Sequence, residues 1–151
     1  MIKRLTIFLS TGAYAGFIPV MPGTFGTLWG VPLAYLLSGR PLHEQAVATL
    51  AVTIASVLIA GRAARYMGAN DPQSIVCDEI AGFLTSILLI PFSWFNAILV
   101  FILFRFFDIL KPYPIRLMER RIKGGAGIVL DDIMAGVYAN ISAHVILWGI
   151  R

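Results

Sequence analysis

Long stretches without a charged side chain constrain this chain more than any other feature of its sequence. No Asp, Glu, Lys or Arg occurs in residues 5–39, 46–61, 80–104 or 133–150. A hydrocarbon core about 30 Å thick is crossed by roughly 20 helical residues, so several of these runs are long enough, or nearly so, to span a membrane. The chain is 58% hydrophobic and 13% charged, whereas a soluble domain has about 25% charged residues. The sequence therefore predicts an integral membrane protein.

A single domain over residues 1–151 is expected, because a chain of 151 residues has no room for a second core. Its net charge of +4 suits an anionic membrane surface or an anionic substrate. Nucleic acid is not an expected partner, since the basic residues lie between the apolar runs rather than on a soluble basic face.

Prolines and glycines divide the apolar runs into an all-α bundle of about five to six short helices. The first helix contacts the membrane in this reading, although the N-terminus also resembles a short secretory signal. An amphipathic helix around residues 111–121 is expected to lie at the membrane surface. The other helices are expected over about residues 5–18, 26–37, 46–61, 78–90, 95–110 and 131–148.

The positive-inside rule predicts the sidedness of this bundle. Arg62 and Arg65 fall in one loop, and six cations fall between Arg105 and Lys123, so both segments are expected on the cytoplasmic side. One straight helix over residues 80–104 would separate them, whereas a break at Pro91 returns the chain to the same side. The acids at the ends of the apolar runs would then share one cytoplasmic face.

Two acidic pairs stand at the edges of apolar runs, in "IVCDEIAG" (residues 75–82) and "IVLDDIMAG" (residues 128–136). Helix N-capping accounts for one acid of each pair but not for both. Converging carboxylates repel unless a cation lies among them, and Mg²⁺ prefers oxygen ligands. We therefore predict a Mg²⁺ site from Asp78, Glu79, Asp131 and Asp132, with Asp108 nearby.

The segment "FRFFDILKP" (residues 104–112) adds cations to these acids. In a helix Arg105, Asp108 and Lys111 fall close to one face. They form either an ion-paired helix end stopped by Pro112 or a site in which Asp108 contacts metal or water and the two cations bind phosphate oxygens.

Two further segments carry weaker signals. "MPGTFGT" (residues 21–27) is either a backbone anion cradle with Thr24 as a donor or a helix break. The arginines of the amphipathic helix are expected to face lipid headgroups, and Arg116 is also a candidate for substrate binding. Glu44 and Glu119 are expected to be ordinary surface acids, and His43 and His144 are not expected to be ligands.

Four segments in order, "PGTFGTLWG", "DPQSIVCDEIAGF", "FRFFDILKPYPI" and "GGAGIVLDDIMAGVYA", closely resemble the phosphatidylglycerophosphatase A family over about residues 21–141. The resemblance implies a Mg²⁺-dependent, multi-pass enzyme of the bacterial cytoplasmic membrane that acts in phospholipid biosynthesis. Its implied reaction is hydrolysis of phosphatidylglycerophosphate to phosphatidylglycerol and inorganic phosphate. By position, the resemblance implies acidic site residues at Asp71, Asp78, Glu79, Asp108, Asp131 and Asp132, with Arg105 and Lys111 as basic partners. Together with the reading of the individual residues, this gives expected metal ligands (Asp71, Asp78, Glu79, Asp131, Asp132), catalytic residues (Asp108, Lys111, Asp131, Asp132) and substrate-binding residues (Thr24, Arg105, Lys111, Arg116).

The mechanism expected for such a site has two forms. In the first, a water held by the metal and activated by a carboxylate attacks phosphorus; in the second, an aspartate forms a phospho-enzyme. Other classes fit less well. A CDP-alcohol phosphotransferase needs a D-G-x-x-A-R signature that this sequence lacks, and a cation transporter needs acids in the middle of its helices.

Overall fold

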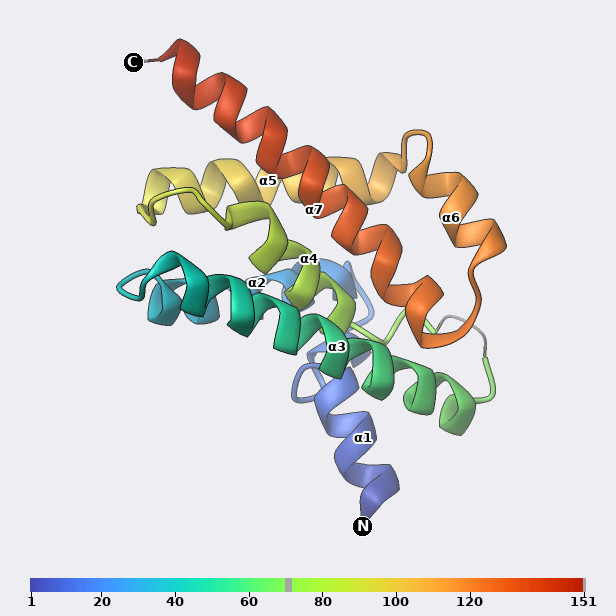
Figure 1. Ribbon diagram of the computed structural model, residues 1–151. Coiled ribbons are helices and arrows are strands. Elements are labelled where there is room, and N and C mark those ends of the chain that lie inside the picture. The colour runs from blue at the N-terminus through green and yellow to red at the C-terminus, as the bar shows by residue number, and fades with distance from the viewer. Residues whose placement is uncertain (70–71, 151) are drawn as a thin grey trace.

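A computed structural model describes residues 1–69 and 72–150, and over these residues it has seven α-helices, one short 3-10 helix and no strand (Figure 1). The all-α prediction is confirmed for this part of the chain, and the seven α-helices correspond to the six helices and the one amphipathic helix expected. The helices are α1 (Ile2–Ser10), η1 (Ala15–Phe17), α2 (Pro22–Leu37), α3 (Leu42–Met67), α4 (Cys77–Ile87), α5 (Trp94–Leu110), α6 (Ile115–Arg121) and α7 (Gly124–Gly149).

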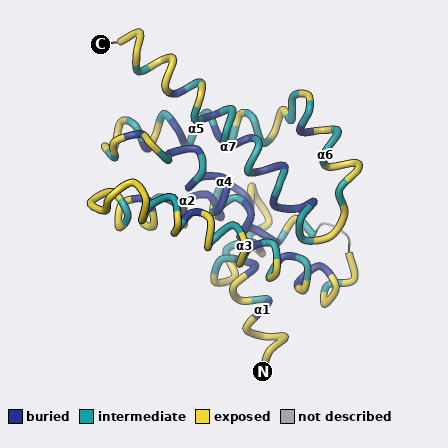
Figure 2. The backbone as a smooth tube through the Cα atoms, viewed as in Figure 1, coloured by how far each residue is buried: buried dark blue, intermediate teal, exposed yellow. Residues whose placement is uncertain are grey.

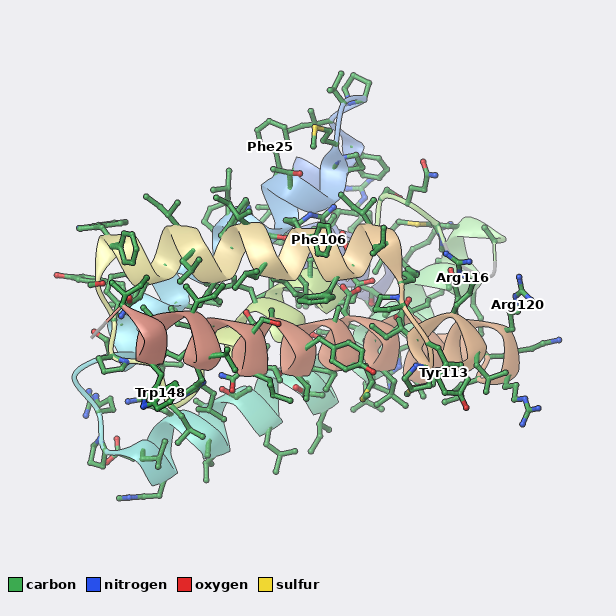
Figure 3. The ribbon with its side chains drawn as sticks, turned by 90° about the horizontal axis from the view of Figure 1, so that it is seen from above. Phe25, Phe106, Tyr113, Arg116, Arg120 and Trp148 are labelled. Atoms are coloured by element: carbon green, nitrogen blue, oxygen red, sulfur yellow. The ribbon has the colours of Figure 1, made fainter. Side chains whose placement is uncertain are left out.

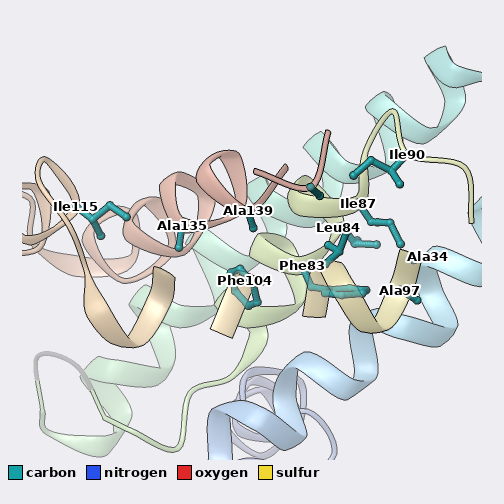
Figure 4. Packing of buried hydrophobic residues seen from close by; sticks show 12 residues of the cluster. Ala34, Phe83, Leu84, Ile87, Ile90, Ala97, Phe104, Ile115, Ala135 and Ala139 are labelled. Atoms are coloured by element: carbon teal, nitrogen blue, oxygen red, sulfur yellow. The ribbon is translucent and has the colours of Figure 1, made fainter. Parts of the chain in front are cut away.

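The short helix α4 lies at the centre of the bundle, in contact with α2, α3, α5 and α7. Its side chains Phe83 and Leu84 are buried, and Figure 4 shows them in one cluster with Phe104 of α5 and Ala139 of α7. Burial of such apolar side chains is the main stabilising contribution to the fold. Helix α4 is therefore a core helix, and its position decides where its acidic first turn lies.

Glycines allow α4 and α7 to approach at backbone distance. A Cβ on Gly136 would lie 2.5 Å from the carbonyl oxygen of Gly82, and one on Gly82 would lie 2.8 Å from that of Asp132. Real Cβ atoms essentially never come this close to another heavy atom. The absence of these two side chains therefore brings the acids of α7 beside those of α4.

The apolar run over residues 80–104 is broken into two helices, as predicted. Helix α4 ends at Ile87 and α5 begins at Trp94, with Ser93 Oγ accepting a hydrogen bond from the Asn96 amide. The Asn140 side chain donates to the carbonyls of Ser86 and Leu88, at 3.0 and 2.6 Å, which satisfies the end of α4. As Figure 1 shows, the connections that follow α3 and α5 lie at the same end of the bundle.

Several helix boundaries differ from the predictions. The first helix ends at Ser10 rather than residue 18, because Gly12, Ala13 and Tyr14 adopt positive φ. Helix α2 begins at Pro22 rather than residue 26, since proline fits the first helical position. Helix α3 is extended at both ends, over 26 residues. The interfacial helix is also shorter than predicted, beginning at Ile115.

The largest boundary error concerns the second acidic pair. Helix α7 begins at Gly124 rather than Asp131, so Asp131 and Asp132 lie in its third turn. The N-capping alternative is therefore wrong for this pair, and neither acid is explained by the free amides at a helix start. For the first pair the prediction was closer, because Asp78 and Glu79 lie in the first turn of α4.

Apolar side chains also cover much of the outer surface. Figure 2 shows α4 largely buried and exposed residues along the outer helices. Exposed side chains include Leu50 and Ile54 of α3 and Ile98 and Ile102 of α5, each more than half exposed. Within the described residues, α3 is the one helix that is long and apolar enough to cross a membrane, fewer than the several spans predicted.

Candidate active site

Three carboxylates from two helices converge where the acidic turn of α4 meets α7. One oxygen from each of Asp78, Glu79 and Asp132 lies within 4.8 Å of the other two. Asp78 and Asp132 are 8% and 4% exposed, and the Glu79 side chain is 12% exposed. Carboxylates so far removed from water are costly to keep charged without a cation among them.

The electrostatics of this carboxylate cluster follow from burial and mutual repulsion. Burial raises the pKa of Glu79 to about 8, and the charge of Asp132 adds to this effect. Burial also raises the pKa of Asp132, followed by the charge of Asp108, and it raises the pKa of Asp78 together with the charge of Glu79. The cluster therefore lacks the positive charge that would keep all three of its carboxylates ionised.

Two oxygens of the cluster are available to a metal. Glu79 Oε2 and Asp132 Oδ2 are buried and have no hydrogen-bond partner within the described part of the chain. Unpaired buried oxygens are uncommon in folded proteins, where buried polar groups almost always have a partner. Carboxylate oxygens in this arrangement fit Mg²⁺, which takes hard oxygen ligands.

Arg105 lies beside this cluster on α5. Its Nη1 is 2.7 Å from Asp108 Oδ2 and 3.8 Å from Glu79 Oε1. Gly23, at the start of α2, lies against both partners, because a Cβ there would be 2.9 Å from Arg105 Nη1 and closer still to Glu79. Arg105 is therefore ion-paired with Asp108, as expected of an ion-paired helix end. It also faces the carboxylate cluster, as expected of a cation that binds phosphate there.

Lys111 supplies the second cation. Its Nζ is 2.6 Å from Asp131 Oδ2 and 2.9 Å from Glu119 Oε1. Burial alone would lower the pKa of Lys111, but the hydrogen bond and charge of Asp131 outweigh it and the pKa is raised. Glu119 is exposed, as expected of a surface acid, but its pairing with Lys111 was not predicted, because that contact depends on the direction in which α6 leaves the proline turn.

An open cavity of about 330 Å³ joins these groups. Its walls include Met21, Pro22 and Gly23 at the start of α2, so part of the segment predicted to be either an anion cradle or a helix break borders the cavity. Its polar lining contains seven of the predicted site residues: Asp78, Glu79, Arg105, Asp108, Lys111, Asp131 and Asp132.

The other predicted site residues lie elsewhere. Thr24 is in the first turn of α2, and its buried Oγ1 has no hydrogen-bond partner within residues 1–69 and 72–150. Arg116 is exposed on α6, donates from Nη2 to the Leu110 carbonyl at 3.2 Å, and lines a neighbouring groove rather than this cavity. Asp71 lies outside the described residues.

Comparisons with known proteins show which family the chain resembles. The family model described as phosphatidylglycerophosphatase A matches residues 8–147. A phosphatidylglycerophosphatase A of Escherichia coli is 35% identical over 139 residues, which are 91% of this chain and 79% of the relative. That of Haemophilus influenzae is 37% identical over 140 residues, covering 91% and 86% of the two chains.

A third relative has a different name. A putative phosphatidylinositol-3-phosphatase of Bacteroides thetaiotaomicron is 36% identical over 154 residues, covering 95% of this chain and 94% of the relative. No solved structure matches the chain significantly.

Proposed function

Because the chain belongs to the phosphatidylglycerophosphatase A family, we propose that it is a phosphoric monoester hydrolase that converts phosphatidylglycerophosphate to phosphatidylglycerol and inorganic phosphate. One observation carries this proposal: buried carboxylates and the cations Arg105 and Lys111 line one cavity. A phosphate monoester dianion repels a nucleophile, and positive groups around it remove that barrier. Since phosphatidylglycerol is a phospholipid, the proposed reaction would be a step of phospholipid biosynthesis.

We propose that Asp78, Glu79 and Asp132 hold Mg²⁺, with Asp131 and Asp71 as further ligands. The unpartnered oxygens of Glu79 and Asp132 support this assignment. When bound, the ion supplies positive charge to the carboxylates and to the phosphate. Arg105 and Lys111 then bind phosphate oxygens by charge-assisted hydrogen bonds, while Asp131, bonded to Lys111, fixes the position of that ammonium group.

The chemical step proposed is in-line attack by water. A carboxylate of the site, from Asp108, Asp131 or Asp132, takes a proton from the water as its oxygen bonds to phosphorus. The bond from phosphorus to the glycerol oxygen breaks, and a proton passes to that oxygen, so that an alcohol and inorganic phosphate leave. Attack by an aspartate is the alternative, and a phospho-enzyme trapped on Asp108 or Asp131 would establish it instead.

Phosphate release from phosphatidylglycerophosphate tests the function and the site together. The wild type is expected to release phosphate with Mg²⁺ and to stop when a chelator is added. Asp131→Asn is expected to lose most of this activity, whereas Glu44→Gln, which removes a surface acid paired with Arg40, is expected to keep it. Full activity of Asp131→Asn, or activity indifferent to chelator, would overturn the site assignment.

A multi-pass position in the bacterial cytoplasmic membrane, with the site on the cytoplasmic side, is part of the proposal. The exposed apolar faces of α3 and α5 support contact with lipid. Helix α4 has 11 residues, about 16 Å at 1.5 Å per residue, too short to cross a bilayer. Helix α3 is the proposed spanning helix by length and composition. Helix α4 together with residues 88–93 carries the chain to the other end of the bundle, and α5 returns it, so that the connections after α3 and α5 lie on the same side.

The Bacteroides relative supports a second candidate substrate, phosphatidylinositol 3-phosphate. Like phosphatidylglycerophosphate, this lipid carries a phosphomonoester on its headgroup and a phosphodiester that joins the headgroup to diacylglycerol. Parallel assays with the two lipids separate the candidates, and a higher kcat/KM for the inositol lipid would replace the first assignment.

A further inference from the structure

A second hollow opens beside the candidate active site, at the corner between α5 and α6. This groove has a volume of about 470 Å³, and Lys111, Arg116 and Arg120 are among its lining residues. Leu110, Tyr113 and Leu117 form apolar parts of its wall. Lys111 also lines the carboxylate cavity, so one ammonium group borders both hollows.

The charged residues that line this corner groove are all cations, and one of them, Lys111, is paired with Asp131 and Glu119 outside the lining. The lining has three cations and, among the residues that the structure describes, no carboxylate. Arg116 and Arg120 are four residues apart on α6, which places them on the same side of the helix, and Figure 3 shows both at one end of the molecule, with Tyr113 nearby. The hydrogen bond from Arg116 to the Leu110 carbonyl holds its guanidinium over the end of α5.

We propose that the corner groove binds the phosphodiester of the lipid substrate, and that Arg116 and Arg120 thereby select lipids with a phosphodiester near the monoester. The proposal rests on the proposed function, since it assumes that the monoester occupies the carboxylate cavity. Guanidinium groups suit phosphate oxygens. In phosphatidylglycerophosphate one glycerol separates the two phosphates, and the two hollows are likewise adjacent, sharing Lys111.

The apolar parts of the groove fit the same occupant. Tyr113 and Leu110 are 80% and 52% exposed at the rim, where the diacylglycerol part of the lipid would continue from the phosphodiester. A soluble phosphate ester has no group for this rim. The occupant is thus a phospholipid headgroup with its acyl chains rather than free phosphate.

The alternative explanation for the arginines of α6 is a general attraction of this helix to an anionic membrane surface. Arg121 distinguishes the two, because it is on the same helix and exposed but is not a lining residue of the groove. Attraction to a surface depends on the total charge of the helix. Loss of any one of the three arginines would then have the same effect, whereas a phosphodiester site depends on Arg116 and Arg120.

The test uses the full chain in neutral detergent micelles and two readouts. The first is the Kd of short-chain phosphatidylglycerol, which has a phosphodiester and no monoester; the second is kcat and KM for phosphatidylglycerophosphate. Arg116→Gln and Arg120→Gln are each expected to raise Kd and KM about tenfold, the effect of one charge-assisted hydrogen bond, with kcat unchanged. Arg121→Gln is expected to match the wild type in both.

Each of the other outcomes contradicts either the groove assignment or the proposed phosphatase function. Wild-type Kd values in both Arg116→Gln and Arg120→Gln, or an equal loss in Arg121→Gln, would overturn the groove assignment while the phosphatase activity stands. If the wild type releases no phosphate but the Kd pattern holds, the proposed function fails and the lipid site remains. Arg120→Gln is included as a second variant because Arg116 also donates to the Leu110 carbonyl of α5, so that loss of Arg116 removes a structural contact as well. The thermal midpoint of each variant shows whether its fold is intact.

Discussion

Burial raises the pKa of Asp132, and the negative charges of Asp108, Asp78 and Asp131 raise it further. A carboxylate in such surroundings is either protonated or close to a cation. Its unpartnered Oδ2 favours the second state when a divalent ion is present. At the scale of single residues, the sequence predicted correctly that the acids of the two pairs lie close together, because the predicted topology put them on one face of the bundle. It placed Asp131 at the start of a helix, whereas Asp131 and Asp132 lie in the third turn of α7.

Removal of one oxygen ligand is expected to weaken Mg²⁺ binding. Asp132→Asn should raise the Kd for Mg²⁺ by about tenfold or more, because an amide oxygen replaces a charged one at the buried cluster. Calorimetric titration of the purified protein measures this directly, without substrate. Glu44→Gln serves as the matched control at a distant surface acid, and an unchanged Kd in Asp132→Asn would remove it from the metal site.

Stability should depend on pH in the metal-free protein. The pKa of Glu79 rises from 4.5 to about 8 on folding, so between these values the folded state binds more protons than the unfolded state. Folding stability therefore falls as the pH rises through this range. The thermal midpoint in chelator is expected to fall over this interval, and saturating Mg²⁺ should reduce the fall, since bound metal stabilises the folded state. A midpoint that rises over the same range would contradict the assigned direction.

The α4–α7 contact is the element-scale feature on which the site depends. The break at Pro91 was predictable, because the positive loops on either side of residues 80–104 required the chain to return. The early start of α7 was not, since a segment such as "GGAG" favours a turn. Its helix is set by packing instead, because Gly125 lies against the backbone of α3 at Val57. Tertiary contacts of this kind have no signal in local sequence.

A side chain at the α4–α7 contact is expected to damage the site without touching a ligand. Gly136→Ala would place a methyl group 2.5 Å from the Gly82 carbonyl and should cost about 1–3 kcal/mol of unfolding free energy. Separation of the helices should also weaken Mg²⁺ binding. Gly149→Ala, on the same helix with open space around it, is the control. Chemical denaturation and a metal titration of both variants measure the two effects, and equal behaviour of the two would show that the contact is not tight.

The arrangement of the whole molecule puts the cavity, the corner groove and the positive connections at one end of the bundle. Figure 1 shows the α2–α3 and α4–α5 connections at the other end. Exposed apolar faces on α3 and α5 lie between these ends. In the proposed membrane position, a lipid substrate would reach the groove from the membrane plane, with its headgroup at the level of the acids.

Cysteine labelling of intact cells and inverted vesicles tests this orientation. Cys77 is buried and is the one cysteine of the chain, so a Cys77→Ser background leaves no other thiol. Arg65→Cys and Arg121→Cys, at the end of the bundle that holds the site, are expected to react with an impermeant maleimide in inverted vesicles only. Ser38→Cys, in the α2–α3 connection, should react in intact cells. Labelling of all three from the same side would exclude the proposed topology, because a bundle with both ends on one side of the bilayer has no spanning helix.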